Sequence, residues 1–164
     1  MKNRVEYNGY MPGTIGRITE IEAKYYNSKW GFGRTFEAKI ATTLSGFICD
    51  FDRDRDGLWT ACIDDRVEGS IAVDGREHDT EGAQLRWFFL SPEFRGQGIG
   101  DSLIGHAMDF CKQKKYSRVY LWTFEGLTSA RRLYEKYGFR LVEQHEGSHW
   151  GTKVTEQKLV LHSR

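Results

Sequence analysis

Three glycines stand close together in the stretch Arg95-Gly96-Gln97-Gly98-Ile99-Gly100. They follow a short apolar run that ends at Leu90 and lead into an amphipathic stretch that begins at Ile99. Because glycine has no side chain to block approach, successive backbone N–H groups can point at a phosphate, and the positive end of the following helix dipole adds to the attraction. The stretch therefore predicts a pyrophosphate-binding loop, although three glycines alone are also typical of a plain turn.

Two common nucleotide-binding loops fit the sequence poorly. A P-loop ends in Gly-Lys-Ser/Thr, whereas this stretch continues Gly-Ile-Gly-Asp and lacks the lysine that holds a terminal phosphate. A dinucleotide fold places its glycines in the first strand-to-helix unit, with an acidic residue about 20 positions later. Here two helices and three strands are predicted to come first, which disfavours a dinucleotide-binding domain. The missing lysine disfavours an NTPase.

The elements that position this loop follow from the spacing of apolar residues. Helical spacing predicts helices over residues 15–30, 36–48, 99–111 and 130–137. Short apolar runs predict strands over residues 58–63, 67–73, 84–90, 119–123, 139–143 and 153–161, and the charged residues 75–82 predict an exposed loop. Strands that alternate with helices indicate an α/β sandwich on one mixed sheet, and we expect a single domain over residues 1–164.

Composition excludes several classes of partner. Lys and Arg number 24 against 23 Asp and Glu, so no net field favours nucleic acid or an anionic membrane. No apolar run approaches the roughly 20 residues of a membrane span, and the first residues lack a signal-peptide pattern. Cys49, Cys62 and Cys111 are too far apart for a zinc site and odd in number, and the five histidines lack metal-ligand spacing. We expect a soluble cytoplasmic protein without a metal.

Two motifs carry a family resemblance. The segment LSPEFRGQGIG, residues 90–100, resembles the acetyl-CoA signature of the GNAT acyltransferase superfamily, and LYEKYGF, residues 133–139, resembles its later helix and strand at the expected separation. More narrowly, Phe36-Glu37, Leu85-Arg86-Trp87, Leu121-Trp122-Thr123 and the segment near Trp150 resemble the acetyltransferase half of MarR–GNAT fusion proteins. No winged-helix segment precedes these motifs, so we do not expect DNA binding.

The resemblance implies a mixed, mostly antiparallel central sheet with splayed central strands, flanked by helices. It implies that the pantetheine arm of acetyl-CoA pairs with the backbone of Phe88, Phe89 and Leu90 as an added strand would. It also implies that the pyrophosphate is wrapped, mainly by backbone amides, by Arg95, Gly96, Gln97, Gly98, Ile99, Gly100, Asp101 and Ser102. Ile99 itself should face the core. Tyr134 matches the tyrosine that protonates the leaving thiolate, although its helical stripe alone indicates a core residue.

Two positions depart from the family pattern. Leu127 stands where many members have an Asn that contacts pantetheine, and Gln84 appears where some members have a glutamate base. The general base therefore stays open among Glu81, Glu125 and a histidine. On the acceptor side, Trp30, Phe36 and Glu37 are predicted to line a site whose aromatic rings and carboxylate suit a cationic amine, while simple packing of two helices is the alternative.

The favoured function is acetyl-CoA-dependent N-acetyltransfer to a primary amine of a small molecule or peptide, directly within a ternary complex. Cys111 belongs to the apolar face of its predicted helix, which makes it a poor nucleophile and disfavours a covalent enzyme intermediate. A CoA-binding or sensor module without turnover, and an acyltransferase for another acyl group or a hydroxyl acceptor, remain alternatives. A homodimer is compatible with the sequence.

Overall fold

The computed structural model describes residues 3–163 and shows one seven-stranded sheet with the strand order β1-β2-β3-β4-β5-β7-β6. Its strands are β1 (Val5–Asn8), β2 (Gly57–Ile63), β3 (Arg66–Asp74), β4 (Ala83–Leu90), β5 (Arg118–Phe124), β6 (Arg140–Gly147) and β7 (Val154–His162). Neighbouring strands are antiparallel except for the parallel pair of β4 and β5. The expected mixed, mostly antiparallel sheet is confirmed.

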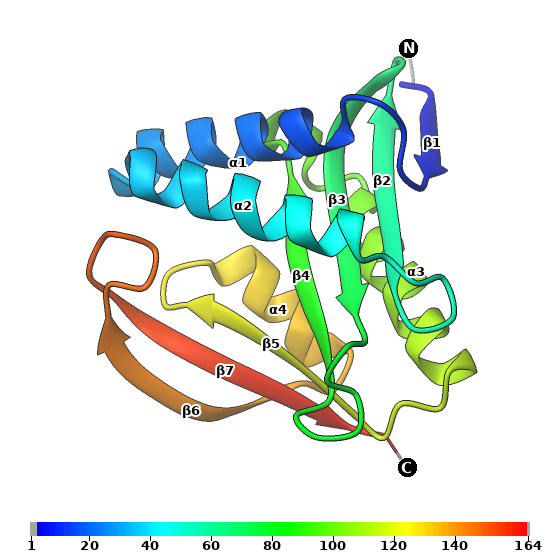
Figure 1. Ribbon diagram of the computed structural model, residues 1–164. Coiled ribbons are helices and arrows are strands. Elements are labelled where there is room, and N and C mark those ends of the chain that lie inside the picture. Colours follow the sequence, from blue (N-terminus) through cyan, green and yellow to red (C-terminus); the bar gives the residue numbers. More distant parts are fainter. Residues whose placement is uncertain (1–2, 164) are drawn as a thin grey trace.

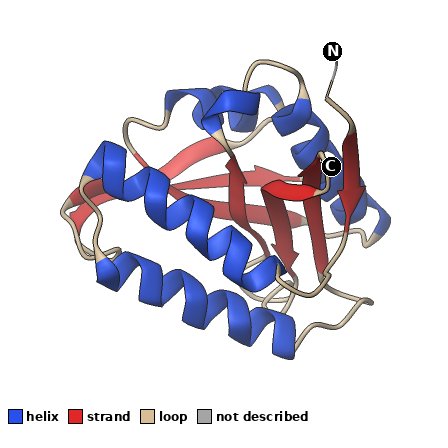
Figure 2. Ribbon diagram, turned by 90° about the horizontal axis from the view of Figure 1, so that it is seen from above, coloured by secondary structure: helices blue, strands red, loops and turns tan. Residues whose placement is uncertain are grey.

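Four helices cover the two faces of this sheet. They are α1 (Thr14–Trp30), α2 (Arg34–Cys49), α3 (Ile99–Gln113) and α4 (Thr128–Lys136). The helices α1 and α2 lie side by side on one face, and Figure 2 shows the sheet between this pair and the helices of the opposite face. The largest apolar cluster fills the space under α3 and α4, and two smaller clusters lie under α1 and α2.

The parallel pair β4 and β5 separates shortly after it begins. Ladder pairs join Ala83 to Val119 and Gln84 to Tyr120, and beyond Gln84 the two strands diverge (Figure 1). In that figure β4 continues upward while β5 turns away toward the loop that leads into α4. The predicted splay of the central strands is therefore present, and it opens the middle of the sheet.

A bulge in β4 directs side chains at this opening. Ser70 of β3 faces Phe89 and Ala72 faces Arg86, so β4 carries one extra residue between these two pairs. Trp87 takes a left-handed backbone with φ of 50°, and its carbonyl accepts a hydrogen bond of 2.6 Å from the Ser70 hydroxyl. Because of the extra residue, Trp87 and Phe89 pack under α1 and α2, on the face opposite Leu85, whereas Phe88 shares the face of Leu85 and contacts α4.

The predicted elements all occur, with differences at their ends and one omission. The four-residue strand β1 was not predicted; all its residues are half-buried and it pairs only with β2, so its apolar alternation is weak. Strand β6 continues to Gly147, beyond the predicted end at residue 143. Nearly all of β6 is exposed, and a strand without a buried face leaves no periodic signal in the sequence.

Candidate active site

A cleft of about 1060 Å³ occupies the opening between β4 and β5. Its walls come from α1, α2, α4, the loop before α3, and the strands β4 to β7. Of the predicted site residues, those that line it are Trp30, Phe36, Phe88, Phe89, Leu90, Arg95, Gly96, Gly98, Gly100, Asp101, Leu127 and Tyr134. The cleft thus brings together segments that lie more than 100 residues apart in the chain.

Four predicted residues do not line the cleft. Gln97 and Ser102 have exposed side chains, and Ile99 is buried in the core under α3, where it was expected. Glu37 is exposed on α2, so the structure corrects its predicted place in an acceptor site. The reason is helical geometry, since Phe36 faces the sheet and the next residue points about 100° away around the helix axis.

The glycine-rich loop forms one end of the cleft. Gly96 and Gly98 have φ of 79° and 82°, in the left-handed region that favours glycine, and a Cβ at either position would meet no atom within 4 Å. Gly98 is the N-cap of the 15-residue helix α3, whose first-turn N–H groups lack intrahelical acceptors. Open space, free amides and a helix dipole together fit a phosphate group.

The side chain of Arg95 points away from this loop. Its Nε donates a hydrogen bond of 2.9 Å to the carbonyl of Leu90, and its guanidinium lies 4.8 Å from the ring centre of Tyr25. Asp101 is also engaged, because Lys136 donates a 2.7 Å hydrogen bond to its carboxylate and lowers its pKa. The phosphate-binding potential of the loop therefore resides in its backbone amides.

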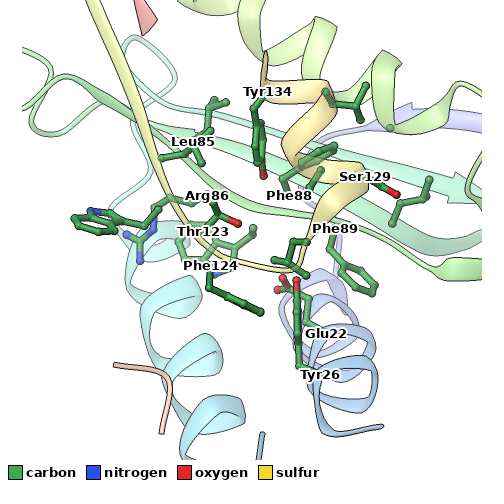
Figure 3. A pocket seen from close by; sticks show the side chains of 18 of the residues that line it. Glu22, Tyr26, Leu85, Arg86, Phe88, Phe89, Thr123, Phe124, Ser129 and Tyr134 are labelled. Carbon is green, nitrogen blue, oxygen red and sulfur yellow. The ribbon is translucent and has the colours of Figure 1, made fainter. Parts of the chain in front are cut away.

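Tyr134 lies on the opposite wall, in α4. Its ring packs edge-on against Phe88 with centroids 5.8 Å apart, and burial raises the pKa of its hydroxyl well above the usual value for tyrosine. The helix ends two residues later, at Lys136; Gly138 then takes a φ of 99°, and Phe139 donates its N–H to the carbonyl of Tyr134. The hydroxyl points into the cleft (Figure 3) and holds its proton at neutral pH, as a proton donor must.

The two residues that depart from the family pattern, Leu127 and Gln84, each contact neighbouring side chains. Leu127 is the N-cap residue of α4 and packs with the aromatic cluster under α1 and α2. Gln84 lies where β4 still pairs with β5, and its side-chain oxygen accepts a hydrogen bond from the hydroxyl of Tyr120 at 3.3 Å. Gln84 is therefore at the closed end of the opening.

Aromatic rings build the end of the cleft that contains Trp30, where the sequence predicts an acceptor. Trp30 packs edge-on against Phe124 with centroids 4.9 Å apart, and Phe124 in turn contacts Trp150 at 5.5 Å. Gly126, with φ of 108°, leaves room for Trp30, since a Cβ on Gly126 would overlap the Trp30 ring. Helix α1 ends just after this tryptophan because Gly31 adopts the left-handed conformation of a C-cap.

Several polar residues of the cleft were not identified from the sequence. Glu22 on α1 is 6% exposed, and its Oε2 has no hydrogen-bond partner among the described residues. Glu156 on β7 is equally buried, and its Oε2 lies 2.8 Å from Nε2 of His145 on β6. Lys39 on α2 has a pKa lowered by burial. The apolar residues four positions before and after Glu22, Ile18 and Tyr26, were the signal that it faces the sheet.

Three other residues considered as catalytic groups lie outside the cleft. Cys111 is buried under α3 and outside the cleft, and burial raises the pKa of its thiol to about 12. Glu81 and Glu125 do not line the cleft. Across residues 3–163, no three His, Cys, Asp or Glu side chains lie close enough together to hold a metal ion. The helices described here are all too short or too polar to cross a membrane.

Two curated proteins are similar to this chain in sequence. An uncharacterized N-acetyltransferase of Methanocaldococcus jannaschii is 28% identical over 150 residues, which cover 86% of this chain and 66% of the relative. N-acetylaspartate synthetase of Danio rerio is 35% identical over 89 residues, which cover 54% of this chain and 31% of the relative. The chain thus matches from about a third to about two thirds of the length of these relatives.

Solved structures share the fold. A GNAT-family acetyltransferase from Staphylococcus aureus Mu50 has a TM-score of 0.76 at 16% identity and covers 97% of this chain and 99% of its own. An acetyltransferase from Streptococcus agalactiae 2603 has a TM-score of 0.74 at 21% identity, with coverage of 97% and 98%. Residues 16–139, which hold most of the cleft, match the family model described as Acetyltransferase (GNAT) family. The chain belongs to the GNAT family of acetyltransferases.

Proposed function

We propose that this chain is an acetyl-CoA-dependent N-acetyltransferase that moves an acetyl group to a primary amine directly, within a ternary complex. One observation carries the proposal: the cleft between β4 and β5 joins a glycine-lined phosphate site to an aromatic site with buried carboxylates. A cosubstrate that enters from the first site and an acceptor that enters from the second meet beside Tyr134.

Segments along the cleft suit the successive chemical groups of coenzyme A. Its diphosphate suits the amides from Gly96 to Ser102, at the start of α3. Its pantetheine arm carries amide groups, which suit β4 from Phe88 to Leu90, because no ladder pair joins this part of β4 to β5 in the described chain. Phe88 supplies an apolar surface next to Tyr134.

Acetyl-CoA supplies an activated thioester. Transfer forms a C–N bond and breaks the C–S bond. The ammonium group loses two protons in total, of which one balances the proton that the sulfur takes up and the other is released to solvent. Tyr134 donates its O–H proton to the departing thiolate and regains a proton from the nitrogen, and backbone N–H groups of β4 stabilise the negative charge on the carbonyl oxygen. The raised pKa of Tyr134 keeps this hydroxyl protonated before transfer.

The acceptor end suits an amine. Trp30, Phe124 and Trp150 offer aromatic faces, which attract cations, and Glu22 and Glu156 offer carboxylates in a largely buried setting. Relatives named for nitrogen acceptors, such as N-acetylaspartate synthetase of Danio rerio, support the same class of reaction. We therefore expect a small-molecule or peptide amine as acceptor.

A thiol-release assay tests the proposal. Acetyl-CoA is incubated with the protein and a panel of methylamine, 2-phenylethylamine, spermidine, lysine and an alanine-initiated peptide, and free CoA is measured against a blank without acceptor. Release that depends on one of these amines, with the acetylated amine identified by mass spectrometry, supports the proposal. Binding of acetyl-CoA without release for any amine contradicts it and indicates a binding module.

A further inference from the structure

Glu22 is a buried carboxyl group that faces the cleft without a partner. It is 6% exposed, and its Oε2 makes no hydrogen bond within residues 3–163. Isolating a buried polar atom in this way costs free energy, and such groups are rare in native proteins, where a catalytic role or a bound ion is among their explanations. The position of Glu22 on α1 is fixed by its neighbours, because Ile18 and Tyr26, four residues before and after it, are buried on the same face of the helix.

The carboxylate lies beside the place where transfer is proposed. In Figure 3 the carboxylate of Glu22 and the hydroxyl of Tyr26 point toward the same part of the cleft as the hydroxyl of Tyr134. Glu22 reaches it from α1 on one face of the sheet, and Tyr134 from α4 on the other. The negative charge of Glu22 contributes to the raised pKa of both tyrosines, as expected of groups that lie close together.

The remaining carboxylates are less well placed. Oε1 of Glu156 also has no hydrogen-bond partner among the described residues, but Oε2 of Glu156 lies 2.8 Å from Nε2 of His145, and the charge of Glu156 acts on Lys39 of α2. The charge of Glu156 therefore acts on groups of α2 and β6 rather than on Tyr134. Glu81 and Glu125, which the sequence left open as bases, do not line the cleft. Glu22 is the cleft carboxylate whose charge acts on Tyr134.

We infer that Glu22 binds the ammonium group of the acceptor and removes its proton, as the general base of the transfer. The inference rests on the proposed function. One oxygen of the ionised carboxylate accepts the N–H proton, the bonding electrons stay on nitrogen as the lone pair that forms the new C–N bond, and Glu22 becomes neutral. It returns the proton to solvent after the product leaves, so no oxidant or further reactant is needed.

The surroundings of Glu22 make it a suitable base. Burial raises its pKa to about 8, close to the working pH at which a general base is most effective. The groups that face it are the hydroxyls of Tyr26 and Tyr134, and the charge of Arg95 reaches Tyr26. On α2, burial lowers the pKa of Lys39, and the charge of Glu156 on β7 opposes this lowering. An ammonium ion therefore provides the missing cation for Glu22.

Kinetics of Glu22→Gln give the first test, because glutamine keeps the shape of the side chain and cannot accept the proton. With the most reactive amine of the panel, we expect kcat to fall by ~10²-fold or more, as is typical when a general base is removed. The limb of kcat/KM against pH that reflects Glu22 should disappear. The control is Glu20→Gln, the same substitution on the same helix at a half-buried position outside the cleft.

An infrared titration of the whole protein gives a second test that needs no turnover. Between pH 6 and 10, the wild type should lose the C=O band of a protonated carboxyl with a midpoint near pH 8, and Glu22→Gln should lack this band. Saturating methylammonium should move the midpoint to lower pH, since a cation next to the carboxylate favours its ionised form. The Glu20→Gln protein should behave as the wild type does.

These outcomes separate the two proposals. Full kcat and an unchanged pH profile in Glu22→Gln would overturn the inference while amine acetylation by the wild type stands. A missing band, or a midpoint that methylammonium does not move, would overturn it as well. Failure of the wild type to acetylate any amine would contradict the proposed function, and the infrared titration would still decide whether Glu22 binds an ammonium ion.

Discussion

Replacing Glu22 by Gln should make the protein more stable at alkaline pH. Burial raises the pKa of Glu22 from 4.5 to about 8 in the folded protein, whereas the unfolded chain exposes this carboxyl to water. Between these two values the folded state holds a proton that the unfolded state has released. The free energy of unfolding of the wild type therefore falls as pH rises through this interval, by up to ~1.4 kcal/mol per pH unit from this one group.

The size of the effect follows from the width of the interval. From pH 4.5 to 8 the loss amounts to at most about 5 kcal/mol, because the slope applies only where the two states differ by a full proton. Glutamine has no proton to lose, so Glu22→Gln is free of this pH term. In a domain of this size 1 kcal/mol shifts Tm by roughly 2–4 °C, and the variant should melt on the order of 10 °C higher than the wild type at pH 9.

Calorimetry from pH 5 to 9, without ligand, measures this difference. The gap in Tm between Glu22→Gln and the wild type should be small at pH 5 and should widen up to pH 8 or 9. The control Glu20→Gln should show the opposite sign, because Lys24 lowers the pKa of Glu20 and an acid with a lowered pKa stabilises the fold above its unfolded value. Parallel curves for Glu22→Gln and wild type would show that Glu22 ionises as it does in water.

Four further changes test the cleft. Saturation with acetyl-CoA at 100 times its Kd should stabilise the fold by ~2.7 kcal/mol, measured as a rise in Tm. Gly98→Val should weaken CoA binding by about tenfold or more in calorimetric titration, since a β-branched residue strains a φ of 82°, and a native far-UV spectrum is its control. Tyr134→Phe should lower kcat ~10²-fold, with the Kd of acetyl-CoA within a few-fold of wild type; an unchanged kcat in a rate limited by chemistry would remove the hydroxyl from the mechanism. Gly126→Ala should displace the Trp30 ring and raise KM for the amine more than KM for acetyl-CoA, and equal changes in both would contradict the assignment of Trp30 to the acceptor end.

The fold could be predicted from the sequence where burial leaves a pattern. The apolar stripe of α3 and the apolar run of β4 are both packed on the sheet, so their period and length predict helix and strand directly. The glycine loop before α3 could be predicted because left-handed residues next to a helix N-terminus favour glycine, and its binding of phosphate stays a prediction. The short strand β1 and the outer part of β6 carry too little burial to leave such a pattern.

The buried carboxylates of the cleft could not be predicted for a different reason. Glu22 sits in the apolar stripe of α1, and a sequence does not show whether a polar residue in such a stripe faces packed side chains or a cavity. Its place in the cleft depends on the divergence of β4 and β5, which is a property of strand pairing some 60 to 100 residues away. Glu37 was predicted instead because it follows the aromatic Phe36 in sequence, although the two point in different directions.

The divergence of β4 and β5 also creates unpaired strand edges inside the sheet. A sheet that opens in its middle has two additional edges, whose backbone N–H and C=O groups are free to pair with an extended ligand. Here both edges lie at the cleft, between α1 on one face and α4 on the other. Amide exchange along residues 85–90 should accordingly be slowed by CoA far more than exchange in β2. Slower exchange along residues 85–90 would indicate that this edge of β4 is paired only when the cosubstrate is bound.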